Sequence, residues 1–176
     1  QILEPRKLDE PTNKTNYNYP NYSFGVDLAA KTQLMDPEDP ARAQLYVKLT
    51  GRMQASDHLN IWMRYEQNLY SEMSDSRGSD SPALPNVRTL INRYLVEGDS
   101  GLEQLYAEYQ TSLSSSLHTR SYIGLLETMY GGVGGEILYA PYQQRWALGV
   151  NANVVKQRSF KRDFAFRDYE TVTAHV

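Results

Sequence analysis

The chain contains no cysteine, which excludes disulfide bonds, thiolate nucleophiles and cysteine metal ligands. It also contains no apolar run approaching the roughly 20 residues that a membrane-spanning helix needs. Residues 1–20 are polar and rich in Pro and Asn, so they do not resemble a signal peptide. Positive charge is not in excess, with Lys+Arg 18 against Asp+Glu 21 and a net charge of -3. We therefore expect no nucleic-acid partner.

The composition is aromatic yet hydrophilic. The 176 residues include 14 tyrosines, while the mean hydropathy is -0.61. This combination is expected when every second residue of a strand faces water or a polar lumen. Membrane β-barrels share it with carbohydrate-binding sandwiches. The length is sufficient for one domain or one closed barrel.

Apolar and polar residues alternate with a period of two along most of the chain. The clearest run is 22–31, and others cover 43–50, 59–66, 104–110 and 146–154, with weaker runs at 117–126 and 135–140. A last strand starts near Tyr169 and is still alternating at Val176. The pattern predicts about eight antiparallel strands within 21–176, the last of them truncated, after a polar linker or N-terminal extension at 1–20.

One segment follows a helical period instead. After Pro85, apolar residues recur at helical spacing, with a potential N-cap before them and a glycine after them: Asn86, then Val87, Leu90, Ile91, Tyr94 and Leu95, then Gly98. This predicts a short amphipathic helix inside a long connection.

The expected connections alternate in length. Residues 54–58, 112–116 and 141–145 form a short set, and 35–42, 71–101, 127–134 and 157–168 form a set that is generally longer and richer in Gly, Ser, Asp and Arg. Short turns at one rim and long loops at the other are typical of an outer-membrane barrel. We therefore predict an all-β fold, an antiparallel transmembrane β-barrel, and because eight strands leave little lumen, we expect it to be part of a larger barrel.

Several longer motifs carry a resemblance to a known family. They are Arg93–Gly98 (RYLVEG) with Gly101-Leu102-Glu103, Gly131–Tyr139 (GGVGGEILY), Arg145–Gly149 (RWALG), Val155–Arg158 (VKQR) and Phe164–Tyr169 (FAFRDY). Together they resemble the YjbH-like family of exopolysaccharide-associated outer-membrane proteins, also called GfcD, over roughly Leu84 to Val176. The family's members are considerably longer than this chain. The resemblance implies an outer-membrane barrel that works with small periplasmic and lipoprotein partners in producing or secreting extracellular polysaccharide. It offers no catalytic motif, so we expect no enzyme.

Aromatic and charged residues share the polar face of the expected strands. Sugar C–H faces stack on aromatic rings while hydroxyls bond polar groups, so we name these residues as candidate glycan contacts in the lumen: Tyr46, Trp62, Arg64, Tyr106, Glu108, Arg120 and Tyr122. Packing of the lumen and a purely structural charge ladder are the competing interpretations. On the apolar face, the rings of Tyr65, Tyr109, Tyr139 and Trp146 fall at strand ends, where a membrane girdle would lie.

The glycine-rich segment lacks the Lys-Ser/Thr pair and the following helix that a phosphate loop needs. We predict instead that Gly131, Gly132, Gly134 and Gly135 determine the fold of a loop. His58, His118 and His175 lack the spacing of a metal site, and we expect neither metal nor cofactor. Loop 157–168 contains many charged residues, including Arg158, Lys161 and Arg162. These residues either contact lipopolysaccharide or exported polymer, or belong to a solvated loop held by local ion pairs.

The sequence thus predicts a protein of the bacterial outer membrane that acts as a conduit or scaffold for exopolysaccharide. Its expected partners are outer-membrane lipids, lipopolysaccharide, the polymer itself, and periplasmic or lipoprotein components of the same system. The alternative is a soluble carbohydrate-binding β-sandwich, which would pack its apolar faces against each other.

Overall fold

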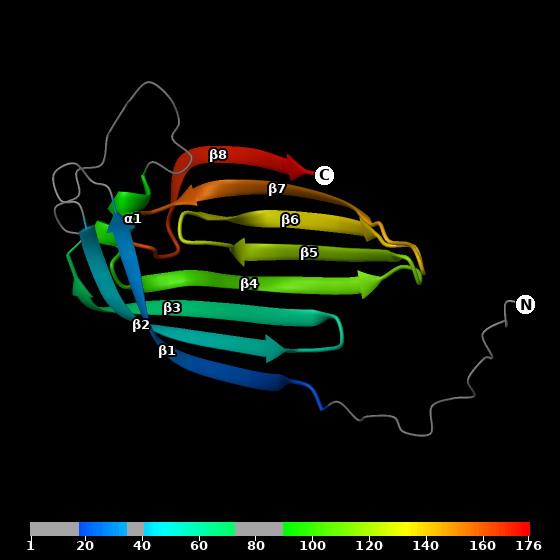
Figure 1. Ribbon diagram of the computed structural model, residues 1–176, viewed down its shortest axis with the longest axis horizontal. Coiled ribbons are helices and arrows are strands. Elements are labelled where there is room, and N and C mark those ends of the chain that lie inside the picture. The colour runs from blue at the N-terminus through cyan, green and yellow to red at the C-terminus, as the bar shows by residue number, and fades with distance from the viewer. Residues whose placement is uncertain (1–17, 35–40, 73–89) are drawn as a thin grey trace, which may run out of the picture.

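The computed structural model describes residues 18–34, 41–72 and 90–176. Its strands run in chain order: β1 (Asn21–Leu34), β2 (Ala41–Gln54), β3 (Leu59–Ser71), β4 (Gly101–Ser112), β5 (Leu117–Leu125), β6 (Tyr130–Tyr139), β7 (Leu148–Arg158) and β8 (Phe166–His175). Each pairs antiparallel with the next in one 8-stranded sheet, and among the described residues β1 does not pair with β8, so the sheet is open (Figure 1). The prediction of an all-β fold with eight antiparallel strands is confirmed.

The connections lie at two ends of this sheet (Figure 1). At one end, which we call the turn end, are the β2–β3, β4–β5 and β6–β7 connections. At the other, which we call the helix end, α1 (Ile91–Glu97) lies beside the β5–β6 and β7–β8 connections. In the described part of the chain, no helix has both the length and the apolar character to cross a membrane.

The register separates side chains onto two faces. Because successive strand residues point to opposite sides, pairs such as Val26↔Leu49 and Asp27↔Lys48 continue the same division from strand to strand. We call the side carrying Val26 the apolar face and the side carrying Asp27 the polar face. Bulges between Leu45/Tyr46 and Arg64/Tyr65 shift the pairing near the helix end.

The exposure of side chains on the two faces is the reverse of that expected for a water-soluble protein. On the apolar face, Phe24 is 78%, Val26 72% and Val172 69% exposed, whereas on the polar face Glu66 is 2% and Glu108 4% exposed. Large apolar side chains thus lie outside, and charged ones are enclosed by neighbours. Any proposed function must account for this distribution of apolar and charged side chains.

The glycine-rich segment is not a loop. Residues 130–139 form β6, so the β5–β6 connection is confined to 126–129, and the prediction of a long loop at 127–134 was wrong. The β6–β7 connection covers 140–147 instead of 141–145, so connection length does not separate the two ends as predicted. A run of glycines carries no alternation that could reveal a strand, and it can pair where a Cβ would not fit.

Gly132 and Gly134 belong to the polar face, and Gly131 and Gly135 to the apolar face. A Cβ on Gly132 would lie 2.8 Å from Val155 Cα and closer still to the carbonyl oxygen of Val154. Close approach of β6 and β7 therefore depends on this glycine. Positive φ is found not here but at Gly124, whose φ is 138.

The predicted helix exists but is shorter. It starts after Leu90, which holds the N-cap position without a side-chain hydrogen bond, while the proposed cap Asn86 lies outside the described residues. Gly98 follows its end as expected, but with a φ of -118 it is not a left-handed cap. A Cβ there would lie 2.8 Å from Arg162 Cγ and would also collide with the Phe160 carbonyl oxygen, so packing explains this glycine.

A small core closes the helix end. Tyr94 of α1 packs with Met129, Tyr130 and Phe160, and its ring meets that of Phe160 edge-on at 4.9 Å. The Tyr94 hydroxyl donates to the carbonyl oxygen of Arg158 at 2.5 Å. Burial raises the pKa of Tyr94 to about 12. The helix is thereby tied to the last strands of the sheet.

Arg158 is the central residue of this closure. Its guanidinium is fully buried and donates to the carbonyl oxygens of Leu102, Glu103 and Glu127 at 2.7, 3.0 and 2.8 Å. Arg162, 2% exposed, pairs with Glu66 at 2.7 Å. Neither residue is therefore free to meet lipopolysaccharide, and the interpretation of both as loop surface charges was wrong.

Candidate functional site

Most charges of the polar face are paired with each other. The pairs join Lys31 to Glu66 at 2.6 Å, Lys48 to Asp27 at 3.5 Å, Arg64 to Glu103 at 3.6 Å, and Arg120 to Glu108 at 2.6 Å and to Glu136 at 3.8 Å. Each pair joins different strands, so together they form a ladder across the sheet. Pairing of this kind offsets the cost of enclosing a charge, although Arg64 Nε is buried without a hydrogen-bond partner among the described residues.

Three aromatic residues of this face lie against cations. Lys31 Nζ is 4.5 Å from the centre of the Tyr46 ring, Arg52 Cζ is 4.8 Å from that of Trp62, and Arg120 Cζ is 5.0 Å from that of Tyr122. The Trp62 Nε1–H is buried without a hydrogen-bond partner within the described residues. These contacts hold the rings in place.

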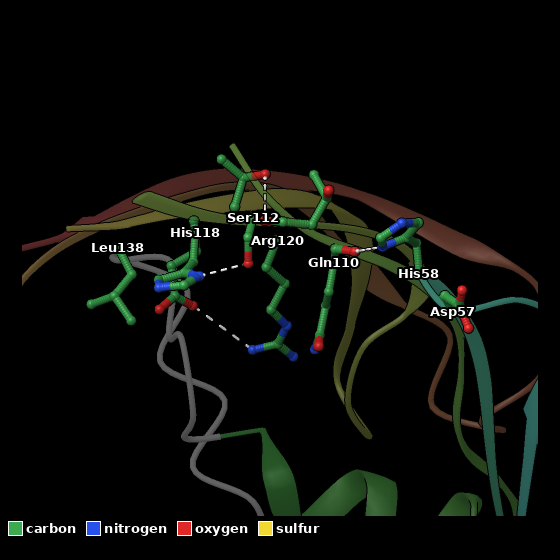
Figure 2. Close-up of a pocket in the computed structure, with 10 residues that line it drawn as sticks. Asp57, His58, Gln110, Ser112, His118, Arg120 and Leu138 are labelled. Atoms are coloured by element: carbon green, nitrogen blue, oxygen red, sulfur yellow. Dashed lines mark hydrogen bonds and ion pairs between the residues drawn. The ribbon is translucent and has the colours of Figure 1, made fainter. Parts of the chain in front are cut away.

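Several hollows lie on the polar face of the described residues. The first, which we call the rim hollow, has a volume of about 520 Å³ and lies toward the turn end, lined by Asp57, His58, Gln110, Thr111, Ser112, His118, Thr119, Arg120, Glu136 and Leu138. Figure 2 shows Arg120 and Gln110 pointing away from the arched sheet, between His118 and His58. His58 Nδ1 lies 2.9 Å from the Gln110 carbonyl oxygen.

Ser112 and His118 form a hydrogen bond across β4 and β5, with Ser112 Oγ 2.8 Å from His118 Nδ1 (Figure 2). A serine nucleophile also needs a carboxylate or similar group orienting the histidine. In residues 18–34, 41–72 and 90–176, His118 has no hydrogen bond or ion pair with a carboxylate, and no cluster of three acidic or histidine residues could hold a metal ion. The pair is a rim contact, and the expectation of no enzyme stays a prediction.

The second hollow, which we call the tyrosine hollow, has a volume of about 460 Å³. It is lined by Gln104, Tyr106, Arg120, Tyr122, Leu126, Glu127, Tyr130, Asn153, Val155, Thr171, Thr173 and His175. The Tyr122 hydroxyl donates to Asn153 and accepts from Asn151 Nδ2 at 2.9 Å. Arg120 lines both hollows and so joins them.

The structure brings only part of the predicted site together. Tyr106, Arg120 and Tyr122 meet in the tyrosine hollow, and Glu108 is held by Arg120 behind them. Three residues lie elsewhere on the same face: Trp62 and Arg64 line another recess with Arg52, and Tyr46 lies toward the helix end at 9% exposure. Whether any of them contacts a glycan stays a prediction.

Sequence reasoning missed the opposite wall of this hollow. Alternation in 146–154 already puts Asn151 and Asn153 on a polar face, but it does not reveal which residues lie opposite them. The register supplies this, because Asn153 pairs with Gly134 on one side and with Thr173 on the other. Thr171 and Thr173 had no signal beyond their place in the last strand.

Comparison with known proteins gives the family. The YjbH family, described as "Exopolysaccharide biosynthesis protein YbjH", matches residues 3–176. The chain belongs to the YjbH family. One relative, "Uncharacterized lipoprotein YjbH" of Escherichia coli (strain K12), is 34% identical over 161 residues, which are 88% of this chain and 23% of that protein. The chain thus spans about a quarter of that relative's length. No solved structure matches this chain.

In this YjbH-family chain, several of the motifs that carried the resemblance meet at the helix end, whereas Arg145–Gly149 lies at the turn end. RYLVEG forms α1 and its end, the GGVGGEILY segment forms β6, and VKQR ends β7 with Arg158. Tyr94 of the first motif bonds the Arg158 carbonyl of the third, and Tyr130 immediately precedes the second. The resemblance therefore coincides with the packing that closes the polar face.

Proposed function

We propose that this chain forms part of the wall of a transmembrane β-barrel in the bacterial outer membrane, and that its polar face lines a conduit or scaffold for exopolysaccharide. The observation that carries the proposal is the inverted exposure of the sheet. Apolar residues such as Phe24 and Val172 lie bare on one face, while Glu66 and Glu108 are enclosed on the other. A lipid environment makes that arrangement favourable, whereas water does not.

Aromatic side chains on the apolar side support the same proposal. Tyr22, Tyr109, Tyr139 and Trp146 lie at the turn end and are 43% to 55% exposed, and Tyr70 and Phe166 lie exposed toward the helix end. Amphipathic rings at both ends of an apolar band are what the two membrane interfaces favour. Tyr139 and Trp146 also contact each other, with ring centres 5.8 Å apart.

The comparisons with known proteins support the proposed link to polysaccharide and a location in the cell envelope. The family description names exopolysaccharide biosynthesis, and the Escherichia coli relative is called a lipoprotein. The alternative, a soluble carbohydrate-binding sandwich, needs a second sheet against the apolar face. All the described strands instead belong to one sheet, whose apolar side chains are exposed, so we prefer the membrane proposal.

The first test is fractionation of the protein, produced with its native flanking sequence, together with its gel mobility before and after heating. A folded barrel is expected in the outer-membrane fraction with a heat-dependent shift. A deletion strain should then yield less extracellular polysaccharide. A protein recovered in the soluble fraction, without a heat-dependent shift, would overturn the membrane proposal.

A pair of lysine substitutions separates lipid from water on the apolar face. Val26→Lys places a charge on that face, and near the bilayer midplane it should cost about 2–4 kcal/mol of folding stability. Ser23→Lys, on the polar face of the same strand, should change stability by less than about 0.5 kcal/mol. Equal, small effects of both substitutions would show that water, not lipid, covers the apolar face.

A further inference from the structure

The tyrosine hollow is lined by side chains of β4 and β5 and by side chains of β7 and β8. Across the polar face the register aligns Tyr106 with Gly124, Gly124 with Gly132, and Gly132 with Val155. A Cβ at Gly124 or Gly132 would collide with the backbone of the neighbouring strand, so these glycines let the strands approach closely beside the hollow. One step along the strands, Gly134 stands between Tyr122 and Asn153, whose side chains lie over it. The volume of the hollow, about 460 Å³, is in the range of small-ligand sites, which measure about 300–1,000 Å³.

The walls of the hollow offer two kinds of contact. Tyr106 and Tyr122 bring aromatic rings from β4 and β5, and Asn153, Thr171 and Thr173 bring amide and hydroxyl groups from β7 and β8. The Tyr122 hydroxyl is held by Asn151 and Asn153, so its ring is fixed before any ligand arrives. Rings for C–H faces beside neutral hydrogen-bonding groups suit a sugar ring.

The charge of the hollow restricts which sugar would fit. Among the described lining residues, Arg120 is the one permanent cation. Its charge is already matched, because Glu108 accepts from Nε at 2.6 Å and Glu136 lies 3.8 Å from Nη1. Glu127 also lines the hollow. A carboxylated, sulfated or phosphorylated sugar would meet no surplus positive charge here and would lie near carboxylates.

We propose that the tyrosine hollow is a subsite for an uncharged pyranose residue of the polysaccharide, and that it rejects sugars bearing an acidic group. The proposal rests on the proposed function, since that function supplies the polymer. It goes further by assigning the subsite and the chemical class of the sugar. Asn153 Nδ2 already donates to Asn151 Oδ1 at 2.6 Å and to Thr173 Oγ1 at 3.3 Å, so it positions the wall of the hollow. The hydroxyl groups of Thr171 and Thr173 select hydroxyl groups of the sugar, and the carboxylates around Arg120 disfavour anions.

The test uses the protein with its native flanks in detergent micelles and measures binding by calorimetry. The probes are neutral β-1,4-linked tetrasaccharides of glucose, mannose and galactose, each beside its counterpart oxidised to a carboxylate at C6. We expect at least one neutral probe to bind at least about tenfold more tightly than its oxidised counterpart. Its affinity should change less than about twofold between low and high salt, because no net charge is recognised.

Occlusion of the hollow provides the matched variants. Thr171→Trp places a large side chain in the hollow, and the adjacent Val172→Trp places the same side chain on the opposite face, at a residue that is 69% exposed. The first should weaken binding of the neutral probe at least about tenfold and the second should leave it unchanged. Equal binding by both variants would overturn the assignment of the subsite.

A third variant tests the charge argument itself. Glu136→Gln removes one of the carboxylates facing Arg120 and should strengthen binding of the oxidised probe by about two- to fivefold, leaving the neutral probe unchanged. Tighter binding of an oxidised probe by the unaltered protein would overturn the proposal, as would no binding of any neutral probe. Fractionation and heat-shift data on the same preparation separate these outcomes from a failure of the proposed function.

Discussion

Adding one methyl group to β6 tests the structure most directly. The Cβ of Gly132→Ala would lie 2.8 Å from Val155 Cα and closer still to the Val154 carbonyl oxygen. Both are backbone atoms, so relief requires β6 and β7 to move apart and not merely a rotamer change. Overpacking of this kind typically costs about 1–3 kcal/mol, and we expect about 2 kcal/mol here.

Two neighbouring glycines provide graded controls. A Cβ on Gly135 would meet its nearest neighbour, the Arg120 carbonyl oxygen, at 3.6 Å, which is ordinary contact. Gly135→Ala should therefore be neutral or stabilise by about 0.5 kcal/mol, because it restricts the unfolded chain. Gly134→Ala would press on the Tyr122 ring and the Asn153 side chain, whose displacement strains the hydrogen bond between them but moves no backbone, so its effect should be intermediate.

The assay is urea unfolding of the protein in micelles, followed by tryptophan fluorescence and by the fraction that shifts on unheated gels. The expected order of midpoints is Gly135→Ala highest, then Gly134→Ala, then Gly132→Ala. Equal midpoints for Gly132→Ala and Gly135→Ala would refute the close approach of β6 to β7.

Three further substitutions test the helix end by the same unfolding assay. Arg158→Lys keeps the charge but cannot reach the carbonyl oxygens that the guanidinium serves, and should cost about 3 kcal/mol; a loss below about 1 kcal/mol would contradict that role. Glu66→Gln leaves the buried Arg162 uncompensated and should cost a similar amount, about 3 kcal/mol, so an unchanged midpoint would count against the ion pair. Tyr94→Phe should cost about 1 kcal/mol at neutral pH. The folded-state pKa of Tyr94 is raised to about 12, so its stabilising contribution is lost as pH rises from about 10 to 12, and Tyr94→Phe should remove that dependence.

Alternation predicted the strands and their faces because a sheet that separates apolar from polar surroundings must repeat every second residue. Runs such as 22–31 and 59–66 therefore lie inside β1 and β3. Alternation cannot predict register, which depends on bulges such as the one between Leu45/Tyr46 and on which residues neighbouring strands place opposite each other. For that reason the sequence places Tyr106, Tyr122 and Asn153 on a polar face, but it does not reveal that Asn153 is the hydrogen-bond partner of Tyr122.

The glycine segment and the arginines at the helix end show another limit of sequence reasoning. Glycine has no side chain to display a period, so a strand made largely of glycines reads as a turn. Arg158 and Arg162 lie among other charges in the sequence, which usually indicates a solvated loop. Their burial follows from carbonyl oxygens of Leu102 and Glu127, and from Glu66 of β3, all distant in sequence.

An inverted sheet has consequences for where a ligand can bind. Where charged groups are enclosed, an unmatched one is costly, so the polar face is stable only while its pairs remain complete. A ligand that broke the contacts of Glu66 or Arg158 would have to replace strong bonds with weaker ones. The tyrosine hollow offers space beside the neutral side chains of Tyr122, Thr171 and Thr173. A sugar bound there would break few of the ion pairs and hydrogen bonds of the polar face. We therefore expect sugar affinity to depend on Thr171 and Tyr122, and folding stability to depend on Arg158 and Glu66.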